Sequence, residues 1–277
     1  MVDILLTTKG KIGIMVEAEV IRPDVFAAKN KEEIERLIVW QGASKLPLSD
    51  FFDVEVRGAA QTSASSGDSS QETQIIIEGD VSRVKRIGQE MKAGSIEISG
   101  SAGMHLGAEM AGGSIFVKGD AGSWSGREMK GGLLHIGGNC GDHVGCAYRG
   151  SWRGMTGGQI TIDGNARSQL GGGLVGGQIM VAGDVENFCG IRQSGGRIIV
   201  RGSAIRAVGA EMNGGVIAVC KGIKQCSPGF VEVAREENPK LADPKLGEMQ
   251  LEGRFIKYTG DYALGKNPKG TLYEREV

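Results

Sequence analysis

The stretch IEISGSAGMHLGAEMAGGS, residues 96–114, is followed directly by IFVKGDAGSWSGREMKGGL, residues 115–133, which repeats the same pattern. Related segments recur over residues 75–222, and the intervals between their first residues are 21, 19, 19, 26, 19, 19 and 19. A fixed period of about 20 residues is typical of a solenoid, in which each unit buries its apolar face only by stacking on its neighbours. The chain therefore contains eight copies of one unit, the last incomplete, which begin at Ile75, Ile96, Ile115, Leu134, Ile160, Ile179, Ile198 and Ile217.

Each copy begins with a short β-strand and continues through several turns. An apolar–x–apolar alternation rich in β-branched residues predicts the strand, as at Ile115 and Val117. A glycine followed by Asp, Asn or Ser comes next, and 36 of the 47 glycines lie in residues 75–222. Such residues accept left-handed backbone angles or bond their own main chain. We therefore predict an all-β fold, a single-stranded right-handed parallel β-helix whose 19-residue coils stack about 4.8 Å apart.

Stacked coils are expected to align equivalent side chains in buried columns. The two apolar strand positions form two columns, and two later positions form a third and a fourth. The predicted columns are Ile75, Ile96, Ile115, Leu134, Ile160, Ile179, Ile198 and Ile217; Ile77, Ile98, Val117, Ile136, Ile162, Val181, Val200 and Val219; Ile87, Leu106, Val144, Leu170, Cys189 and Val208; and Met91, Met110, Met129, Leu174 and Met212.

The flanking segments are predicted to close the two ends of the β-helix. Residues 1–74 are expected to form a short α/β cap, with two strands around Gly10 to Gly13, a further strand at DFFDVEVRG and a flexible loop over 61–73. A helix over 31–40 is predicted from a capping box formed by Asn30 and Glu33, and we expect it to lie over the first coil. Residues 223–277 are expected to form a C-terminal strand extension, in which 248–262 folds back along the coils or covers the far end.

The fourth copy carries seven extra residues, within CAYRGSWRGMTGG at 146–158. A loop that protrudes from a regular solenoid is a common place for function. The insert contains Tyr148, Arg149, Trp152 and Arg153, which are residue types enriched in binding hot spots. We predict a partner interface here; the alternative is that Trp152 only packs against the side of the coils.

A second candidate surface is the outward position between the two buried strand residues. A line of apolar residues on an outer face implies a cover, either the terminal segments or another protein. We therefore add Phe116, Met180 and Ile199 to the predicted partner interface. Along the coils this position reads Ile76, Glu97, Phe116, His135, Thr161, Met180, Ile199 and Ala218.

The polar residues of the repeat predict no catalytic, cofactor-binding or metal site. His105 and His143 lie two coils apart, about 9–10 Å, with Trp124 between them, and one zinc ion needs ligands that are closer together. The glutamates of the G-x-E-M phrase are expected to point into solvent or to pair with nearby basic residues. The period differs from that of the nine-residue calcium β-roll, and the sequence has no dinucleotide fingerprint, H-E-x-x-H or G-x-S-x-G.

The composition limits the classes of partner and the cellular location that we expect. A formal net charge of −1 gives no reason to expect nucleic acid or an anionic membrane as a partner. No apolar run reaches 18 residues and the N-terminus has no signal-peptide pattern, so neither a membrane span nor a leader is predicted. The five cysteines include no C-x-x-C pair, which indicates neither a disulfide framework nor an iron–sulfur motif. We expect a cytoplasmic location.

Four features together resemble the C subunit of formylmethanofuran dehydrogenase. They are the repeat I-x-[IV]-x-G-[DNS]…G-x-E-M-x-G-G, the insert YRGSWRGM, the N-terminal IRPDVFAAKNKEEI and the C-terminal GRFIKYTGDYA. The glycine repeat is also similar to the β-helix domain at the C-terminus of glutamate synthase. The resemblance covers essentially the whole chain, although coils five and six depart from the G-x-E-M phrase.

The resemblance implies a non-catalytic scaffold within a tungsten- or molybdenum-dependent complex that reduces CO2 and forms formylmethanofuran in methanogenesis. Its implied partners are the A, B and D subunits and the iron–sulfur subunits, and the tungsto- or molybdopterin and the iron–sulfur clusters are expected on those subunits. No cofactor is expected on this chain. The alternatives are the equivalent subunit of the bacterial formyltransferase/hydrolase complex and, less favoured, a stand-alone β-helix enzyme.

Overall fold

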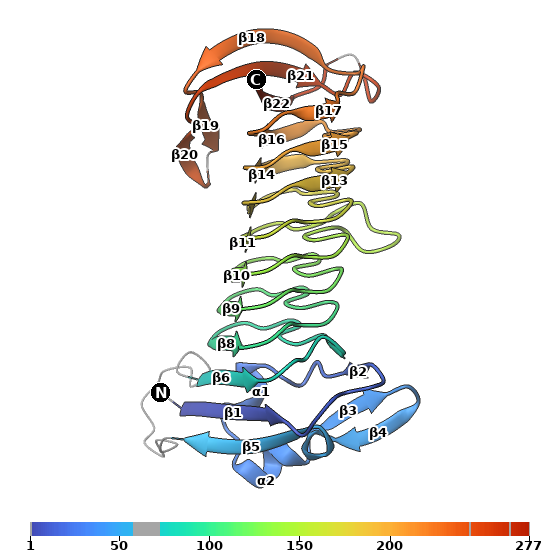
Figure 1. Ribbon diagram of the computed structural model, residues 1–277, viewed down its shortest axis with the longest axis vertical. Helices are drawn as coiled ribbons and strands as arrows, with labels where there is room; N and C mark the ends of the chain where they lie inside the picture. Colours follow the sequence, from blue (N-terminus) through green and yellow to red (C-terminus); the bar gives the residue numbers. More distant parts are fainter. Residues whose placement is uncertain (1, 58–72, 244, 266, 277) are drawn as a thin grey trace.

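The repeats of residues 75–222 stack on one another in the computed structural model, which describes residues 2–57, 73–243, 245–265 and 267–276 (Figure 1). The strands that open the repeats pair in parallel in chain order, each with the equivalent residue opposite, as in Ile75 with Ile96 and Ile96 with Ile115. Each repeat therefore adds one strand to a large sheet and returns to the same place one level up. These strands are β6 (Thr73–Glu78), β8 (Ser95–Ile98), β9 (Ser114–Val117), β10 (Leu133–Ile136), β11 (Gln159–Ile162), β12 (Gln178–Val181), β14 (Ser194–Val200) and β16 (Gly214–Val219).

A second parallel ladder, which the repeat pattern did not predict, runs beside the turns that follow these strands. Single bridges join Val81, Ala102, Ala121, Cys140, Ala166 and Val185 in turn, and the ladder becomes a three-stranded sheet at its end. The strands of that sheet are β13 (Val185–Asn187), β15 (Ala204–Arg206) and β17 (Ile223–Gln225).

Side chains of the Gly-[DNS] turns hold neighbouring coils together along this ladder. The Asn139 backbone N–H donates to Asp120 Oδ1 at 2.6 Å, Asn165 N–H donates to Asn139 Oδ1 at 2.9 Å, and Asp184 N–H donates to Asn165 Oδ1 at 2.8 Å. Each Asp or Asn thus accepts a hydrogen bond from the coil that follows it. These residues stabilise the stack as well as the turn.

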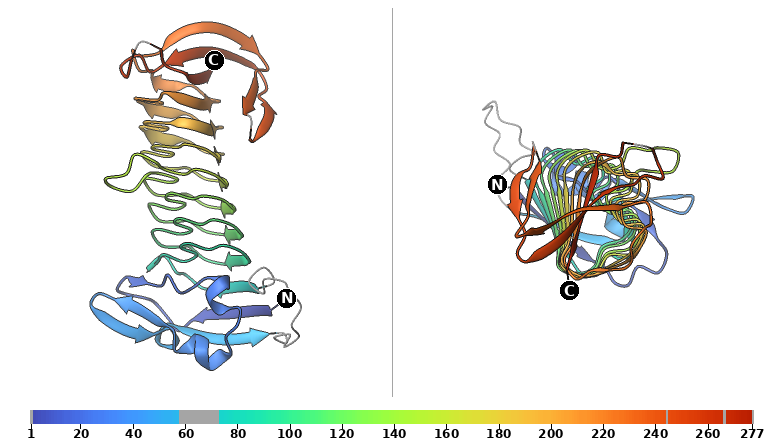
Figure 2. Two further views of the ribbon diagram at one scale, coloured as in Figure 1. Left: turned by 180° about the vertical axis from the view of Figure 1, so that it is seen from behind. Right: turned by 90° about the horizontal axis from the view of Figure 1, so that it is seen from above.

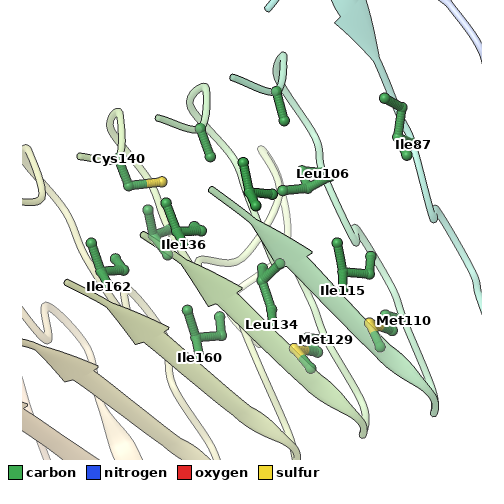
Figure 3. Close-up of a cluster of buried hydrophobic side chains, with 14 of the residues drawn as sticks. Ile87, Leu106, Met110, Ile115, Met129, Leu134, Ile136, Cys140, Ile160 and Ile162 are labelled. Carbon is green, nitrogen blue, oxygen red and sulfur yellow. The ribbon is translucent and has the colours of Figure 1, made fainter. Parts of the chain in front are cut away.

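The four predicted columns are buried, and Figure 3 shows part of them between adjacent coils. The fourth column also contains Met155 and Gln193, both fully buried, at the two levels that the prediction left empty. The Gln193 side-chain amide donates to the carbonyl oxygens of Gly195 and Gly196, each at 3.1 Å, whereas its Oε1 is buried without a hydrogen-bond partner.

The coils turn at residues in the left-handed region, and many of these are not glycine. In one coil the φ angles are 61° at His105, 59° at Gly107 and 57° at Glu109, and the next coil repeats the pattern at Trp124, Gly126 and Glu128. Only the glycines of this pattern could be predicted. Hydrogen bonds between coils, such as His105 N to Ser123 O at 3.0 Å, hold the other residues in this unfavourable region.

The N-terminal segment covers the first coil with strands rather than with a helix. Strand β1 (Val2–Thr8) pairs in parallel with β6, and β5 (Phe52–Arg57) pairs antiparallel with β1. A second small sheet contains β2 (Val16–Glu17), β3 (Ile38–Gln41), β4 (Ser44–Pro47) and β7 (Val84–Lys85), and α1 (Pro23–Phe26), α2 (Lys31–Glu35) and η1 (Leu48–Asp50) complete the segment.

The predicted helix over 31–40 is wrong in its second half. The capping box is present, with Glu33 N–H donating to Asn30 Oδ1 at 3.0 Å, but α2 ends at Glu35 and Ile38 begins β3. The strands predicted in 1–57 are confirmed. The loop predicted over 61–73 lies, apart from Thr73, outside the described residues.

The C-terminal segment closes the far end and also folds back along the coils (Figures 1 and 2). Strand β22 (Gly270–Arg275) pairs in parallel with β16, followed outward by the antiparallel strands β21 (Arg254–Gly260) and β18 (Val231–Glu237). Strands β19 (Lys240–Asp243) and β20 (Gly247–Gln250) form a hairpin that lies against the side of the stack. No helix among the described residues is both long enough and apolar enough to cross a membrane.

Candidate functional site

The insert at 146–158 leaves the stack at coil four and is fixed at both of its roots. Ala147 N–H donates to Gly172 O at 2.9 Å and Gly154 N–H donates to Gly173 O at 2.7 Å, so both ends of the loop are bonded to coil five. Met155 then returns the chain to the buried column. In Figure 1 the loop, drawn in yellow-green, protrudes on the side of the stack away from strands β8 to β11. The tip, residues 148–153, is therefore presented from a fixed base.

The departure of coil five from the G-x-E-M phrase is explained by this loop. Where other coils have Glu109 or Glu128, coil five has Gly173, with φ at 72°. A Cβ atom at Gly173 would lie 2.5 Å from the main-chain oxygen of Trp152. A glutamate at this position therefore has no room beside the insert.

An aromatic stack lies beside the insert, and two of its members, Trp124 and His143, line a pocket there. The ring of Trp124 lies 6.2 Å from that of His105 and 4.1 Å from that of His143, and both pairs are stacked with interplanar angles of 17°. The predicted His–Trp–His column is therefore confirmed as a packing arrangement. Tyr148 from the insert meets Trp124 edge-on at 5.8 Å, and Trp152 also lines this pocket, which has a volume of about 300 Å³.

The two histidines of this stack are held in the neutral form. Burial, together with the nearby Arg127, lowers the pKa of His105 to about 4. Burial also lowers the pKa of His143, against the opposing effect of Asp142. A neutral imidazole stacks on the Trp124 ring without leaving a charge half-buried.

Arginines surround the aromatic groups, but not all of them have acidic partners. Arg127 is buried, pairs with Glu109 at 2.5 Å and places its guanidinium carbon 4.5 Å from the centre of the Tyr148 ring. Arg153 lies 5.0 Å from the centre of the Trp152 ring. Neither Arg149 nor Arg153 pairs with a carboxylate of the described residues. Trp152 is 64% exposed and Tyr148 is 45% exposed.

The glutamates of the G-x-E-M phrase pair with nearby basic residues, which is one of the two arrangements predicted for them; the other is that they point into solvent. Glu90 lies 3.5 Å from Arg22, Glu109 pairs with Arg127, and Glu211 lies 2.8 Å from Arg192. These pairs offset the repulsion between stacked carboxylates.

The outward apolar position is divided between covered and open coils. Ile199 is 1% exposed because Leu241, Phe255 and Tyr273 of the C-terminal segment pack over it, and Met180 packs partly against the same cluster. The prediction of Ile199 as a partner contact is therefore wrong, since the chain covers this residue itself. Phe116 stays 39% exposed and lines an open groove with Ile76 and His135.

A larger concavity, of about 590 Å³, follows the turn ladder. Three of its polar side chains, Asp120, Asn165 and Asp184, are already engaged, because they accept hydrogen bonds from the next coil. Among the described residues, no three or more His, Cys, Asp or Glu side chains gather where they could hold a metal ion. Burial raises the pKa of the Cys140, Cys146 and Cys189 thiols to about 12, so these thiols stay protonated.

Sequence comparison gives relatives that are C subunits of formylmethanofuran dehydrogenases. Over 106 residues, 38% of this chain, the sequence is 56% identical to the C subunit of the molybdenum-containing formylmethanofuran dehydrogenase 1 of Methanosarcina barkeri. It is 42% identical over 106 residues to the C subunit of the tungsten-containing formylmethanofuran dehydrogenase 2 of Methanothermobacter marburgensis. The matches cover 33% and 36% of those relatives, so this chain spans about a third of the curated relatives that it matches. No protein-family model matches the chain.

Structure comparison extends the similarity along the chain. A chain from the crystal structure of the formyltransferase/hydrolase complex of Methylorubrum extorquens, solved in complex with methylofuran, superposes with a TM-score of 0.80 at 26% identity. The superposition covers 99% of this chain and 100% of that chain. The resemblance to the C subunit of formylmethanofuran dehydrogenase is therefore confirmed by homologues of both the molybdenum and the tungsten forms.

Proposed function

We propose that this chain is the scaffold subunit, the C subunit, of a formylmethanofuran dehydrogenase complex that reduces CO2 and forms formylmethanofuran in methanogenesis. The observation that carries the proposal is the 56% identity to the C subunit of a molybdenum-containing enzyme of this class. In this proposal the stacked repeats are a right-handed parallel β-helix, and the rod they form holds other subunits in place.

The scaffold role follows from what the polar groups of the chain already do. The histidines at the insert are neutral and stacked, the glutamates are paired with arginines, and the most buried thiols have a pKa of about 12. These groups stabilise the stack, and we infer that catalysis belongs to the partners. We accordingly assign the tungsto- or molybdopterin and the iron–sulfur clusters to the A, B and D subunits and the iron–sulfur subunits.

A second candidate is the corresponding subunit of a formyltransferase/hydrolase complex. It is favoured by the superposition on a chain of the Methylorubrum extorquens complex, which includes nearly the whole of both chains. The two candidates share the scaffold role and differ in the chemistry of the assembly. In both, the chain carries no reaction by itself.

Affinity purification of the native complex through a tag on this chain separates the two candidates. We expect partner subunits to co-purify together with tungsten or molybdenum bound to a pterin, measured by elemental analysis and pterin fluorescence. A complex that transfers and hydrolyses formyl groups but contains no metal–pterin supports the second candidate. A lone chain that turns over substrate contradicts both.

The insert is the part of this surface that we expect to dock a partner, with Phe116 and Met180 as secondary contacts. Trp152→Ala combined with Arg153→Ala should reduce recovery of the complex at least tenfold, because exposed Trp and Arg side chains are frequent hot spots. The Tm of the isolated chain should change little, since neither side chain is buried. An intact complex from the double variant contradicts this assignment.

A further inference from the structure

The insert has a rigid tip whose two arginines lack acidic partners within the described chain. Ser151 N–H donates to Tyr148 O at 2.9 Å, which closes the tip, and the roots are bonded to Gly172 and Gly173. A tip that is already ordered loses little conformational entropy when it binds. The loop is therefore suited to a specific contact without rearrangement.

The glutamates of the G-x-E-M phrase are already engaged with other groups. Glu109 pairs with Arg127, and Glu128 accepts a hydrogen bond from Tyr148 N–H at 3.2 Å and lies 3.9 Å from Arg127. Glu211 is engaged by Arg192. The charges of Arg149 and Arg153 therefore remain available, and a guanidinium pairs best with a carboxylate that it can contact through two N–H groups.

The distribution of the two arginines favours an extended ligand. Arg149 lines the pocket below the insert, together with Trp152 and His143, whereas Arg153 lies outside the pocket lining, on the exposed side of the same loop. A single small anion inside the pocket would leave Arg153 without a partner. A peptide with several carboxylates can reach both arginines and still place an apolar side chain against Trp124 and Trp152.

We propose that the insert pocket binds an acidic segment of a partner subunit, whose carboxylates pair with Arg149 and Arg153 while a neighbouring apolar side chain enters the pocket that Trp124 and Trp152 line. This inference rests on the proposed function, because it assumes an assembly with other subunits. A second copy of this chain and a free small anion are the occupants that the experiment must separate from it.

The first test compares variants of the native complex, purified through a tag on this chain. Arg149→Glu with Arg153→Glu should lower partner recovery at least tenfold, whereas Arg149→Lys with Arg153→Lys should retain most of it. Arg201→Glu, an exposed arginine without an ion pair among the described residues, is the matched control and should leave recovery unchanged. Each isolated variant should keep the wild-type Tm.

The second test identifies the contact directly. In the Arg149→Lys variant, a carbodiimide joins the new amine to a carboxylate within bonding reach, and peptide mass spectrometry should find the link at an Asp or Glu of another subunit. A link to a second copy of this chain overturns the proposal. The proposal is also overturned if the Arg149→Met with Arg153→Met variant assembles as well as the wild type. The same holds if the Arg149→Glu with Arg153→Glu variant is recovered with its partners at the wild-type level. If the wild-type chain itself is recovered alone, the proposed function fails instead.

Discussion

At the residue scale, the position of the insert depends on the absence of a Cβ atom at Gly173. The backbone there has φ at 72°, which L side chains rarely adopt, and the Trp152 carbonyl oxygen occupies the space of a Cβ atom. Gly150, at the tip of the same loop, has φ at 87° but no atom within 4 Å of its Cβ position. Alanine substitutions at the two glycines therefore distinguish the cost of the left-handed backbone, which both share, from the cost of the steric clash, which only Gly173 has.

Gly150→Ala should cost about 1 kcal/mol of unfolding free energy, because it places a side chain in the left-handed region. Gly173→Ala should cost about 1–3 kcal/mol more, since its Cβ atom also displaces the insert backbone. Denaturant unfolding measures both losses, and Trp152 fluorescence reports the displacement. Equal losses would contradict the steric explanation.

His105 should make stability depend on pH. Its pKa in the folded chain is about 4, below the ordinary 6.5, because of burial and nearby cations. As the pH falls from about 6.5 to about 4, the unfolded chain takes up a proton that the folded chain does not, so stability falls with pH over this range. His105→Asn, which tolerates the left-handed backbone at this position, should flatten the dependence in denaturant titrations between pH 4 and 7.5. An unchanged slope would contradict this origin.

The columns show how far single residues could be predicted. Regular spacing gave the aliphatic positions correctly, but Met155 was missed because the seven extra residues shift it out of register. Left-handed backbone at Glu109 or Trp124 could not be predicted from residue type, since neighbouring coils impose it. The insert residues were found from the broken period, whereas their neighbour Trp124 belongs to the preceding coil, and only the structure brings it together with the insert.

At the scale of elements, the hairpin of β19 and β20 is held to the stack by one buried arginine. Arg197 donates to Gln178 Oε1 at 2.8 Å, to Leu241 O at 2.8 Å and to Gly247 O at 3.2 Å, and it is 3% exposed. The hairpin places Leu241 over Ile199 as a result. This contact could not be predicted from the sequence, because nothing distinguishes Arg197 from the other arginines of the repeats.

Arg197→Met should lower the unfolding free energy by about 1–3 kcal/mol, because the carbonyl oxygens of Leu241 and Gly247 lose their buried donor. Amide hydrogen exchange in β19 and β20 should rise more than in β14. Arg201→Met, a change at an exposed site nearby in the sequence, is the control. Unchanged exchange in the hairpin would contradict the anchoring role.

The predicted elements were more reliable where the repeat supports them than where local propensity acts alone. The strands from β6 to β16 follow the period, whereas the helix over 31–40 is interrupted at Glu35. Val39 there is fully buried and Ile38 pairs with Pro47, so packing against the cap overrides the helical pattern. The second ladder was missed because single bridges such as Ala102 with Ala121 involve one residue per coil.

At the scale of the whole molecule, both ends of the stack are closed by the chain itself. Strands β1 and β5 cover the first coil, and β22, β21 and β18 cover the last. The outer strands carry charged side chains, such as Asp53 and Glu55 on β5, which discourage further pairing. The end strands thereby keep the inner strands from recruiting other chains.

Truncation after residue 222 should convert the chain into oligomers or aggregates. It removes β22 from the edge of β16 and uncovers Ile199 and Ala218, which are now at most 1% exposed. Light scattering after gel filtration measures the outcome. The same truncated chain with Val216→Lys and Ala218→Glu, two substitutions on the outer face, should aggregate less. If the truncated chain without these substitutions stays monomeric, the C-terminal segment does not have this covering role.

The register of the stack has a consequence for spacing. Because the equivalent apolar residues lie directly opposite one another from β6 to β16, a whole repeat can be gained or lost without disturbing the pairing of the others. Each such change moves the two ends of the rod apart or together by about 4.8 Å. If the two ends of the stack bind partners as proposed, the number of repeats sets the distance between those partners in steps of one coil.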